Sequence, residues 1–160
     1  MSQISIVTKF LRCSNLDELT LSDQKLLQAA HSAVAQSYSP YSNFKVGAAL
    51  LTADGNTILG SNQENASYPL CLCAERTALA AASSIAPNIP IIAMAVTAKN
   101  PKIIISQPIS PCGACRQVLC EAEQRGKTNL KIILQGEVGD IFVFESAKDL
   151  LPFFFDATFL

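Results

Sequence analysis

The chain of 160 residues has no tryptophan, a single histidine and few charged residues, which make up 16% of the sequence. Its 12 basic residues do not outnumber its 13 acidic ones, so the formal net charge is -1. A protein that neutralises nucleic-acid phosphates needs a basic surplus, and one that binds an anionic membrane surface needs a polybasic stripe. The composition therefore argues against both classes. With 49% apolar residues, the chain can bury the core of one domain of ordinary size.

The sequence also lacks any apolar run that is long enough to cross a membrane. The longest run, at 89–96, contains Pro90, whereas a spanning helix needs roughly 20 apolar residues. The N-terminus does not show the charged, apolar and small-residue segments of an export signal. We therefore expect a reducing, cytoplasmic location, where the six cysteines are thiols or metal ligands rather than disulfides.

The hydrophobic pattern predicts a single domain over residues 22–160, preceded by an N-terminal arm at 1–21 to which we assign no role. Helices are predicted at 23–36 with Ser22 as N-cap, at 73–82, and at 112–125 with Gly126 as C-cap. Strands are predicted at 44–52, 57–60, 91–96, 130–134 and 141–144, with a hairpin turn at 53–56 and a last helical turn near 147–151. This order predicts an α/β fold, a three-layer α/β/α sandwich around one mixed five-stranded sheet.

Cysteines at two predicted helix starts carry the clearest chemical signal. Cys112 and Cys115 form a C-x-x-C pair, a spacing that lets two thiolates share one metal ion. Cys73 lies 39 positions before Cys112 and also begins a predicted helix, where backbone N–H groups and the helix dipole favour the thiolate. Two such helix starts would supply three sulfur ligands. A structural zinc site needs four protein ligands, whereas a catalytic one leaves a position for water.

Glu75 decides between these two kinds of site. It follows Cys73 by two residues, so it can point near the metal without binding it, and a carboxylate beside metal-bound water can shuttle protons. A closed four-sulfur site that adds Cys71 is an alternative, but it leaves Glu75 without a role. Cys13 and Cys120 are expected to be plain thiols. The lone His31 is expected to face solvent or to pack.

A first ligand followed at the second position by Glu, and later by P-C-x-x-C, matches the signature of zinc-dependent nucleobase deaminases. From about residue 22 to 155 the chain resembles the cytidine deaminase family, in its small form with three cysteine ligands. Four segments in the same order carry the resemblance: PYSNFKVGAAL at 40–50, NQENA at 62–66, CAERTA at 73–78 and SPCGACRQV at 110–118.

The resemblance implies a cytidine deaminase-like fold and a set of roles. One zinc ion per chain would be bound by Cys73, Cys112 and Cys115. Glu75 would be the catalytic proton shuttle, and Arg76 would hydrogen-bond a zinc-bound sulfur and so offset the charge of three thiolates.

The resemblance also implies the substrate contacts and the assembly. Phe44 would stack on the pyrimidine, Asn62 and Glu64 would hold the ribose 3′-hydroxyl, and Tyr68 would approach the 5′ side of the sugar. Ala74 would also contact the substrate. The family is typically a homotetramer, in which Phe155 would reach a neighbouring subunit's site. The apolar tail made of Phe153, Phe154, Phe155 and Phe159 favours such burial against another copy.

The expected reaction is hydrolytic deamination of cytidine and 2′-deoxycytidine to uridine and 2′-deoxyuridine, with release of ammonia, in pyrimidine salvage. Glu75 would pass a proton from zinc-bound water to N3, and the zinc-bound hydroxide would attack C4. One alternative is a deaminase of an aminopyrimidine antibiotic nucleoside, against which Asn62 and Glu64 argue. Another is a non-catalytic, zinc-stabilised binding module, in which Glu75 has no use. We expect no nucleic-acid or membrane partner.

Overall fold

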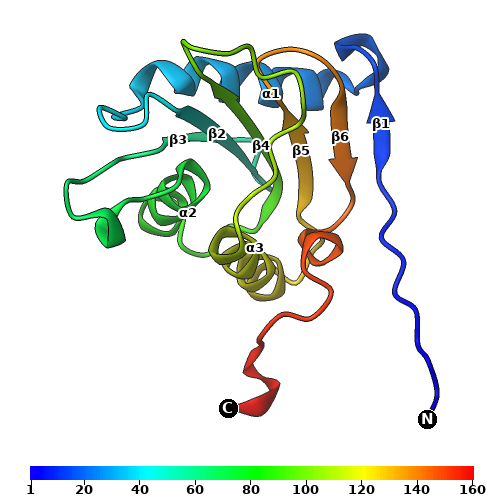
Figure 1. Cartoon of the computed structure of the whole chain (residues 1–160). Helices are drawn as coiled ribbons and strands as arrows, with labels where there is room; N and C mark the ends of the chain where they lie inside the picture. The colour runs from blue at the N-terminus through cyan, green and yellow to red at the C-terminus, as the bar shows by residue number, and fades with distance from the viewer.

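The computed structural model describes residues 1–160, apart from the side chain of Phe159. Along this described backbone, six strands form one mixed sheet in the order β1-β6-β5-β4-β2-β3 (Figure 1). β4 and β5 are parallel, and all the other neighbouring strands are antiparallel. The strands are β1 (Leu11–Cys13), β2 (Lys45–Thr52), β3 (Thr57–Ser61), β4 (Ile91–Lys99), β5 (Lys131–Gln135) and β6 (Ile141–Phe144).

Helices cover both faces of this sheet (Figure 1). α1 (Leu21–Ala33) packs on one face, and α2 (Ala74–Ile85) and α3 (Gly113–Gly126) pack on the other. Each face has its own buried apolar cluster, one shared with α1 and one shared with α2 and α3. The predicted three-layer α/β/α sandwich is confirmed, but the predicted count of five strands was wrong.

The missed strand is β1, which pairs antiparallel with β6 so that Leu11 lies opposite Val143. Three residues are too few to display an alternating apolar pattern, so only the tertiary pairing reveals this strand. Within the segment expected to be an arm, Cys13 and Leu19 are buried. Residues 1–10 lead up to β1 as extended chain, and the N-terminal end projects away from the sheet (Figure 1).

Two helix ends differ from the sequence-based expectation. The N-cap of α1 is Thr20, whose hydroxyl accepts a hydrogen bond from the Asp23 N–H at 3.2 Å, so the prediction of Ser22 was wrong. At the end of α3, Gly126 is still helical and Lys127 adopts the left-handed conformation, with φ 51°. The N-cap differs because Thr and Ser cap helices almost equally well, so the sequence does not distinguish them. The C-cap differs because residues other than Gly can adopt the left-handed conformation at some cost.

Gly60 in β3 sets the distance between the sheet and α2. A Cβ atom placed there would lie 2.5 Å from the Ala74 carbonyl oxygen and 2.5 Å from the Ala78 N–H nitrogen. A side chain at position 60 would therefore push away the first turns of α2, where the sequence places its candidate catalytic residues. This close approach holds the start of α2 against a rigid strand.

Glu123 in α3 is a buried carboxylate that binds the residues following β6. It accepts hydrogen bonds from the Leu130 N–H at 3.0 Å, the Ala147 N–H at 2.9 Å and the Ser146 hydroxyl at 2.8 Å. Lys148 adds an ion pair at 3.5 Å. The carboxylate thereby orders the start of η4 (Ala147–Leu150), the short helix that leads to the C-terminal segment.

Replacing Glu123 with alanine is expected to lower the free energy of unfolding by about 2–4 kcal/mol, since buried donors lose their charged acceptor. Urea unfolding followed by far-ultraviolet circular dichroism measures this change. Glu121→Gln, on the exposed side of the same helix, is the matched control and is expected to shift stability by less than about 0.5 kcal/mol. Equal stability of the Glu123→Ala variant and wild type would contradict this role.

The six cysteines, all within the described residues, are free, which agrees with the expectation of thiols or metal ligands rather than disulfides. Cys120 and Cys13 are buried in the two apolar clusters and behave as small apolar side chains. None of the helices described in the structure has both the length and the apolar character needed to span a bilayer.

Candidate metal centre

The first turns of α2 and α3 bring three cysteines together, as the sequence predicts. Cys73 is the N-cap residue of α2 and Cys112 is the N-cap residue of α3, while Cys115 lies in the first turn of α3. Neither N-cap side chain forms a capping hydrogen bond, so both sulfur atoms are available to a ligand. The three Sγ atoms lie within 4.8 Å of one another.

The spacing of these sulfur atoms fits a zinc ion. The Sγ atoms of Cys73 and Cys112 are 3.9 Å apart, and those of Cys112 and Cys115 are 3.5 Å apart. Tetrahedral zinc with Zn–S bonds of about 2.3 Å requires sulfur atoms about 3.8 Å apart. The cluster is therefore close to the geometry that three thiolates adopt around zinc, with one position left over.

Hydrogen bonding between the thiols makes one of them easy to ionise. The bond with Cys115, aided by the Arg76 charge, lowers the pKa of Cys73 to about 6, although burial opposes it. The same bond raises the pKa of Cys115, which is fully buried. The shared bond thus favours a thiolate within the pair, and the thiolate is the form that binds metal.

Glu75 lies in the first turn of α2, beside the cluster, and only 4% of its surface is exposed. Burial raises the pKa of its carboxyl group, and a hydrogen bond with Cys115 and the charge of Arg76 act in the opposite direction. A buried carboxyl group with a raised pKa next to a metal site is a candidate for moving protons in a reaction.

Cys71 is directed away from the cluster. Its Sγ accepts a hydrogen bond from the Asn65 N–H at 3.2 Å and lies 3.6 Å from the Asn65 carbonyl oxygen. The sulfur cluster found among the described residues has three members and does not include Cys71. The geometry therefore argues against the closed four-sulfur alternative.

A pocket of about 300 Å³ is lined by Glu64, Tyr68 and Cys71 together with Tyr41 and Ser42. Glu64 and Tyr68 are predicted substrate residues, and Tyr68 begins η3 (Tyr68–Leu70). Sequence reasoning did not single out Tyr41, Ser42 or Cys71 as pocket residues. Tyr41 and Ser42 do fall within the first segment that carries the family resemblance, which is a signal that could have found them.

The Glu64 carboxylate closes one side of this pocket. It accepts hydrogen bonds from the Tyr41 N–H at 2.8 Å and the Ser42 N–H at 3.3 Å, and also from the Ser42 hydroxyl. These bonds, the one from the Ser42 hydroxyl above all, hold the pKa of Glu64 below its ordinary value. Glu64 is therefore a fixed, ionised acceptor at neutral pH.

Asn62 organises the neighbouring backbone. Its Oδ1 accepts from the Val46 N–H at 2.8 Å and the Ser37 hydroxyl at 2.6 Å, and its Nδ2 donates to the Phe44 carbonyl at 2.9 Å. An amide nitrogen has two N–H groups, so one donor of Asn62 is left for a ligand. Phe44 itself is half-buried, directly before β2.

A short backbone pairing places the pocket beside the sulfur cluster. Gln63 and Leu72 exchange two N–H···O bonds of 2.9 Å each. This pairing lays the segment that carries Glu64 alongside the residues leading into Cys73. Glu64, which lines the candidate substrate pocket, thus directly follows a residue that is paired with the chain leading into the candidate metal site.

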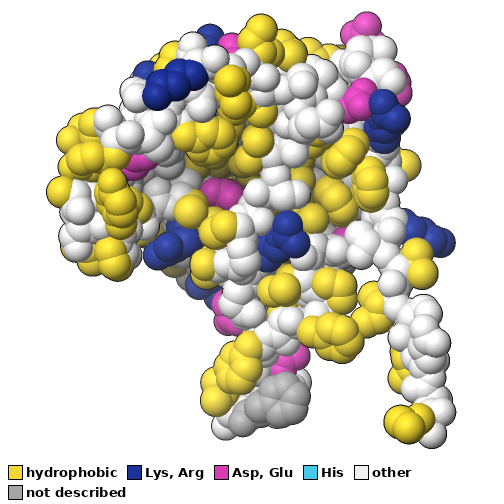
Figure 2. Space-filling model, viewed as in Figure 1, with side chains coloured by type: hydrophobic (Ala, Val, Ile, Leu, Met, Phe, Trp, Pro, Cys, Tyr) yellow, Lys and Arg dark blue, Asp and Glu magenta, His cyan; other side chains and the backbone are white. Residues whose placement is uncertain are grey.

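The remaining predicted residues lie in different surroundings. Ala74 is fully buried directly after Cys73, and Arg76 is half-exposed on α2. Phe155 is 60% exposed on the C-terminal segment. Figure 2 shows apolar side chains gathered over the loop between β3 and α2 and over this segment. His31 packs on the opposite face of the sheet, 2.9 Å from Gln135 Oε1, as a packed residue remote from the cluster.

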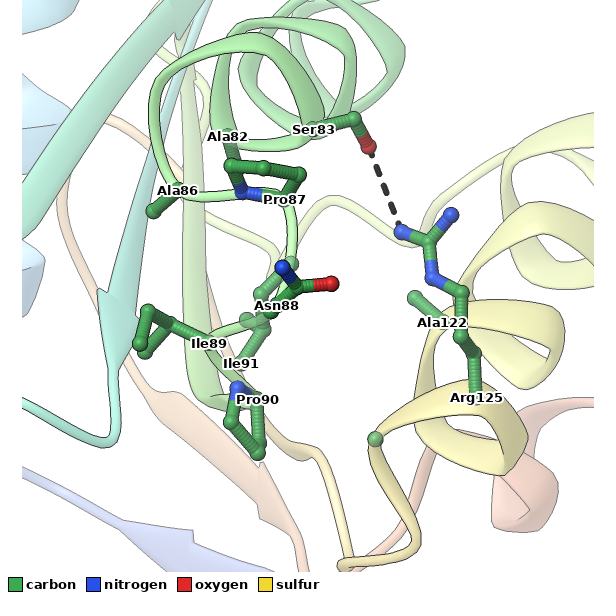
Figure 3. Close-up of a pocket in the computed structure, with 11 residues that line it drawn as sticks. Ala82, Ser83, Ala86, Pro87, Asn88, Ile89, Pro90, Ile91, Ala122 and Arg125 are labelled. Carbon is green, nitrogen blue, oxygen red and sulfur yellow. Dashed lines mark hydrogen bonds between the residues drawn. The ribbon is translucent and has the colours of Figure 1, made fainter.

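A second pocket, of about 220 Å³, lies between the C-terminal ends of α2 and α3 (Figure 3). Arg125 Nη2 donates a hydrogen bond to Ser83 Oγ at 3.2 Å across it, and Pro87 and Pro90 form part of its wall. The 12 residues of α2 span about 18 Å, so this pocket is separate from the cysteine cluster at the other end of the helix.

Comparisons with known proteins agree on one family. The model of the cytidine and deoxycytidylate deaminase zinc-binding region matches residues 20–128. A cytidine deaminase of Halalkalibacterium halodurans is 45% identical over 134 residues, which cover 84% of this chain and 94% of that protein. One of Sporosarcina psychrophila is 46% identical over 98 residues, or 61% of this chain and 68% of that protein. The crystal structure of cytidine deaminase from Burkholderia pseudomallei superposes with a TM-score of 0.73 at 46% identity, covering 86% of this chain and 100% of that one.

Proposed function

The chain belongs to the cytidine and deoxycytidylate deaminase family, and on this premise we propose that it converts cytidine and 2′-deoxycytidine to uridine and 2′-deoxyuridine in pyrimidine salvage. It is an enzyme of the zinc-dependent hydrolase class, and its cofactor is zinc. The observation that carries the proposal is the buried Glu75 carboxyl group beside three sulfur atoms whose spacing fits zinc.

Cys73, Cys112 and Cys115 are the proposed zinc ligands. When bound, zinc would polarise a water molecule so that it attacks carbon at neutral pH. The two helix N-termini add positive potential where three thiolates place negative charge. The half-exposed Arg76 adds a further positive charge beside Cys73, and its hydrogen bond to a sulfur atom remains a prediction.

Glu75 is the proposed proton carrier. Its buried carboxyl group takes a proton from the attacking water and delivers it to N3 of the pyrimidine. A second transfer moves the proton of the hydroxyl group added at C4 to the departing amino group, which leaves as ammonia. Hydrogen bonds and burial fix the carboxyl group in the first turn of α2, so little reorganisation accompanies each transfer.

The sugar and base are proposed to lie in the pocket that adjoins the cluster. Glu64 and the second N–H of Asn62 would hold the ribose 3′-hydroxyl, and Tyr68 would approach the 5′ side of the sugar. The half-buried ring of Phe44 would stack on the base, and Ala74 would contact it at the start of α2. The pocket of about 300 Å³ fits a small molecule of this class rather than a polymer.

We further propose that the active form is a homotetramer. Phe153 and Phe155 expose 84% and 60% of their surface, and Tyr68 and Leu70 expose 68% and 65%. Tyr68 lines the candidate substrate pocket, and exposed apolar groups of this kind are typical of surfaces that another protein surface covers. Phe155 would then complete the site of a neighbouring copy.

The test is to incubate the zinc-loaded protein with cytidine, 2′-deoxycytidine and an aminopyrimidine antibiotic nucleoside in parallel, and to follow the ultraviolet change on loss of the amino group. Rapid turnover of the first two compounds supports the proposal. Turnover of the antibiotic nucleoside alone would replace it with the alternative substrate. No turnover of any of them by protein with one zinc per chain would favour the binding-module reading.

Replacing Glu64 with glutamine is expected to raise the KM for cytidine by roughly tenfold to a hundredfold while changing kcat much less, because a charged hydrogen-bond acceptor for the sugar is lost. Steady-state kinetics on zinc-loaded protein measure both constants. Glu145→Gln, an exposed position remote from the pocket, is the control. An unchanged KM in the Glu64→Gln variant would remove Glu64 from the substrate site.

A further inference from the structure

The C-terminal segment, residues 150–156, is bound to α3 at two points, one at the last residue of η4 and one beyond it. Arg116 Nη1 donates to the Leu150 carbonyl oxygen at 2.9 Å. Further along, Gln117 Nε2 donates to the Phe155 carbonyl oxygen at 2.7 Å, and the Phe155 N–H donates to Gln117 Oε1 at 3.0 Å. One glutamine side chain thus pairs with both backbone groups of Phe155, as a strand partner would.

The side chains of this segment point in two directions. Phe154 packs against the apolar cluster beneath α3, and Lys148 Nζ lies 5.7 Å from its ring centroid. The neighbouring rings of Phe153 and Phe155 are largely exposed. Terminal residues are usually poorly ordered unless they are tied down. Here the backbone is held while two apolar rings remain on the surface.

We propose that Gln117 is a positioning residue, which fixes the backbone of Phe155 so that its ring can complete the substrate site of a neighbouring copy. This inference rests on the proposed function. A ring whose backbone is already held loses less conformational entropy on entering that site, which strengthens substrate binding.

Gln117 lies on the same helix as the cysteines of the candidate metal site. Gln117 follows Cys115 by two residues in α3. The same rigid helix therefore begins with two proposed metal ligands, Cys112 and Cys115, and also carries the two hydrogen bonds that hold Phe155, which we call the Gln117 clamp. Each copy of α3 would therefore serve its own active site and that of a neighbour. Arg116 also donates to the Pro111 carbonyl at 2.8 Å, next to Cys112, so Gln117 is the cleaner position to test.

The test compares zinc-loaded Gln117→Met, which removes both hydrogen bonds, with Gln124→Met, the same change at a half-exposed position on the same helix. We expect Gln117→Met to raise the KM for cytidine about three- to tenfold, with kcat within twofold and zinc content unchanged. Gln117→Glu, which keeps the acceptor and loses the donor, should also raise KM. Gln124→Met should behave as wild type.

Hydrogen exchange supplies a readout that does not depend on activity. Gln117→Met should abolish the protection of the Phe155 amide and leave the amides of α3 protected. Unchanged protection of Phe155 would overturn the clamp. A loss of kcat together with zinc would also overturn the proposal, because it would show that Gln117 supports the metal helix of its own chain.

Co-expression of two variants separates action within a chain from action between chains. In mixed assemblies, a Gln117→Met chain keeps Glu75 and so has a working site of its own. A neighbouring Glu75→Gln chain has no working site but keeps Gln117, so it can supply a correctly held Phe155 to that site. A fraction of sites with wild-type KM supports the proposal, whereas a single raised KM overturns it. Failure of wild type to deaminate cytidine would refute the proposed function instead, and the exchange result would then still decide whether Gln117 orders the segment.

Discussion

Glu75→Gln is expected to lower kcat for cytidine deamination by about a hundred- to ten-thousandfold, the range that a positioned general acid–base group contributes. Glutamine has nearly the same size, but its amide group is neither an acid nor a base near neutral pH, so it cannot move a proton between the attacking water and the pyrimidine. The buried position of Glu75, with 4% of its surface exposed, leaves little room for bulk water to take over this role.

The decisive measurements are kcat, zinc content and thermal stability on the same preparation. The Glu75→Gln variant should bind about one zinc ion per chain and unfold near the wild-type temperature, since burial already disfavours the charged form of this carboxyl group. Glu121→Gln, exposed on α3, serves as the control. Residual activity above a tenth of the wild-type rate would show that another group moves the proton.

Loss of a single sulfur ligand is expected to abolish activity and to destabilise the fold. Cys112 is the best position for this test, because its side chain is exposed and Cys112→Ala removes little packing. The three sulfur atoms join the N-termini of α2 and α3, so a bound ion links two helices that the chain otherwise connects through β4 and a long loop. Binding of metal to the folded state adds directly to stability.

Metal analysis, calorimetry and the cytidine assay together check this prediction. Cys112→Ala should lose most of its zinc, show no measurable turnover and melt at a lower temperature than wild type. Dialysis of wild type against a chelator should cause the same changes, and added zinc should reverse them. Cys71→Ala should keep about one zinc ion per chain, because Cys71 Sγ bonds to the backbone of Asn65 instead. A zinc-free Cys71→Ala variant would revive the four-sulfur site.

The metal centre could be predicted because its determinants are local. Cys73 lies at the start of one helix, and Cys112 and Cys115 lie at the start of another. The alanine-rich run after Cys73 and the regular apolar spacing after Cys112 predict these helices from the sequence. The side chain of Glu75 follows one of these starts by two residues, so its place beside the cluster depends on the same local geometry. Long-range folding had only to bring the two helix starts together.

The pocket walls were harder to predict, because they depend on contacts between distant residues. The exchange of hydrogen bonds between Gln63 and Leu72 sets the pocket beside the metal site, and the bonds from Tyr41 and Ser42 hold Glu64 across 22 or 23 positions. Only the family resemblance pointed to Glu64 and Asn62 in the sequence. Nothing local distinguishes such polar loop residues from ordinary surface ones.

By itself, the sequence determined the three-layer α/β fold, the three cysteines of the candidate metal site and the candidate proton carrier, since periodicity, helix starts and short spacings are local properties. The tertiary structure alone decided the sixth strand at Leu11–Cys13, the burial of Glu123 and the pairing of Gln117 with Phe155. Each of these depends on groups far apart in the chain. The free energy of these contacts comes from pairing and burial that exist only in the folded chain, so no local pattern of residues predicts them.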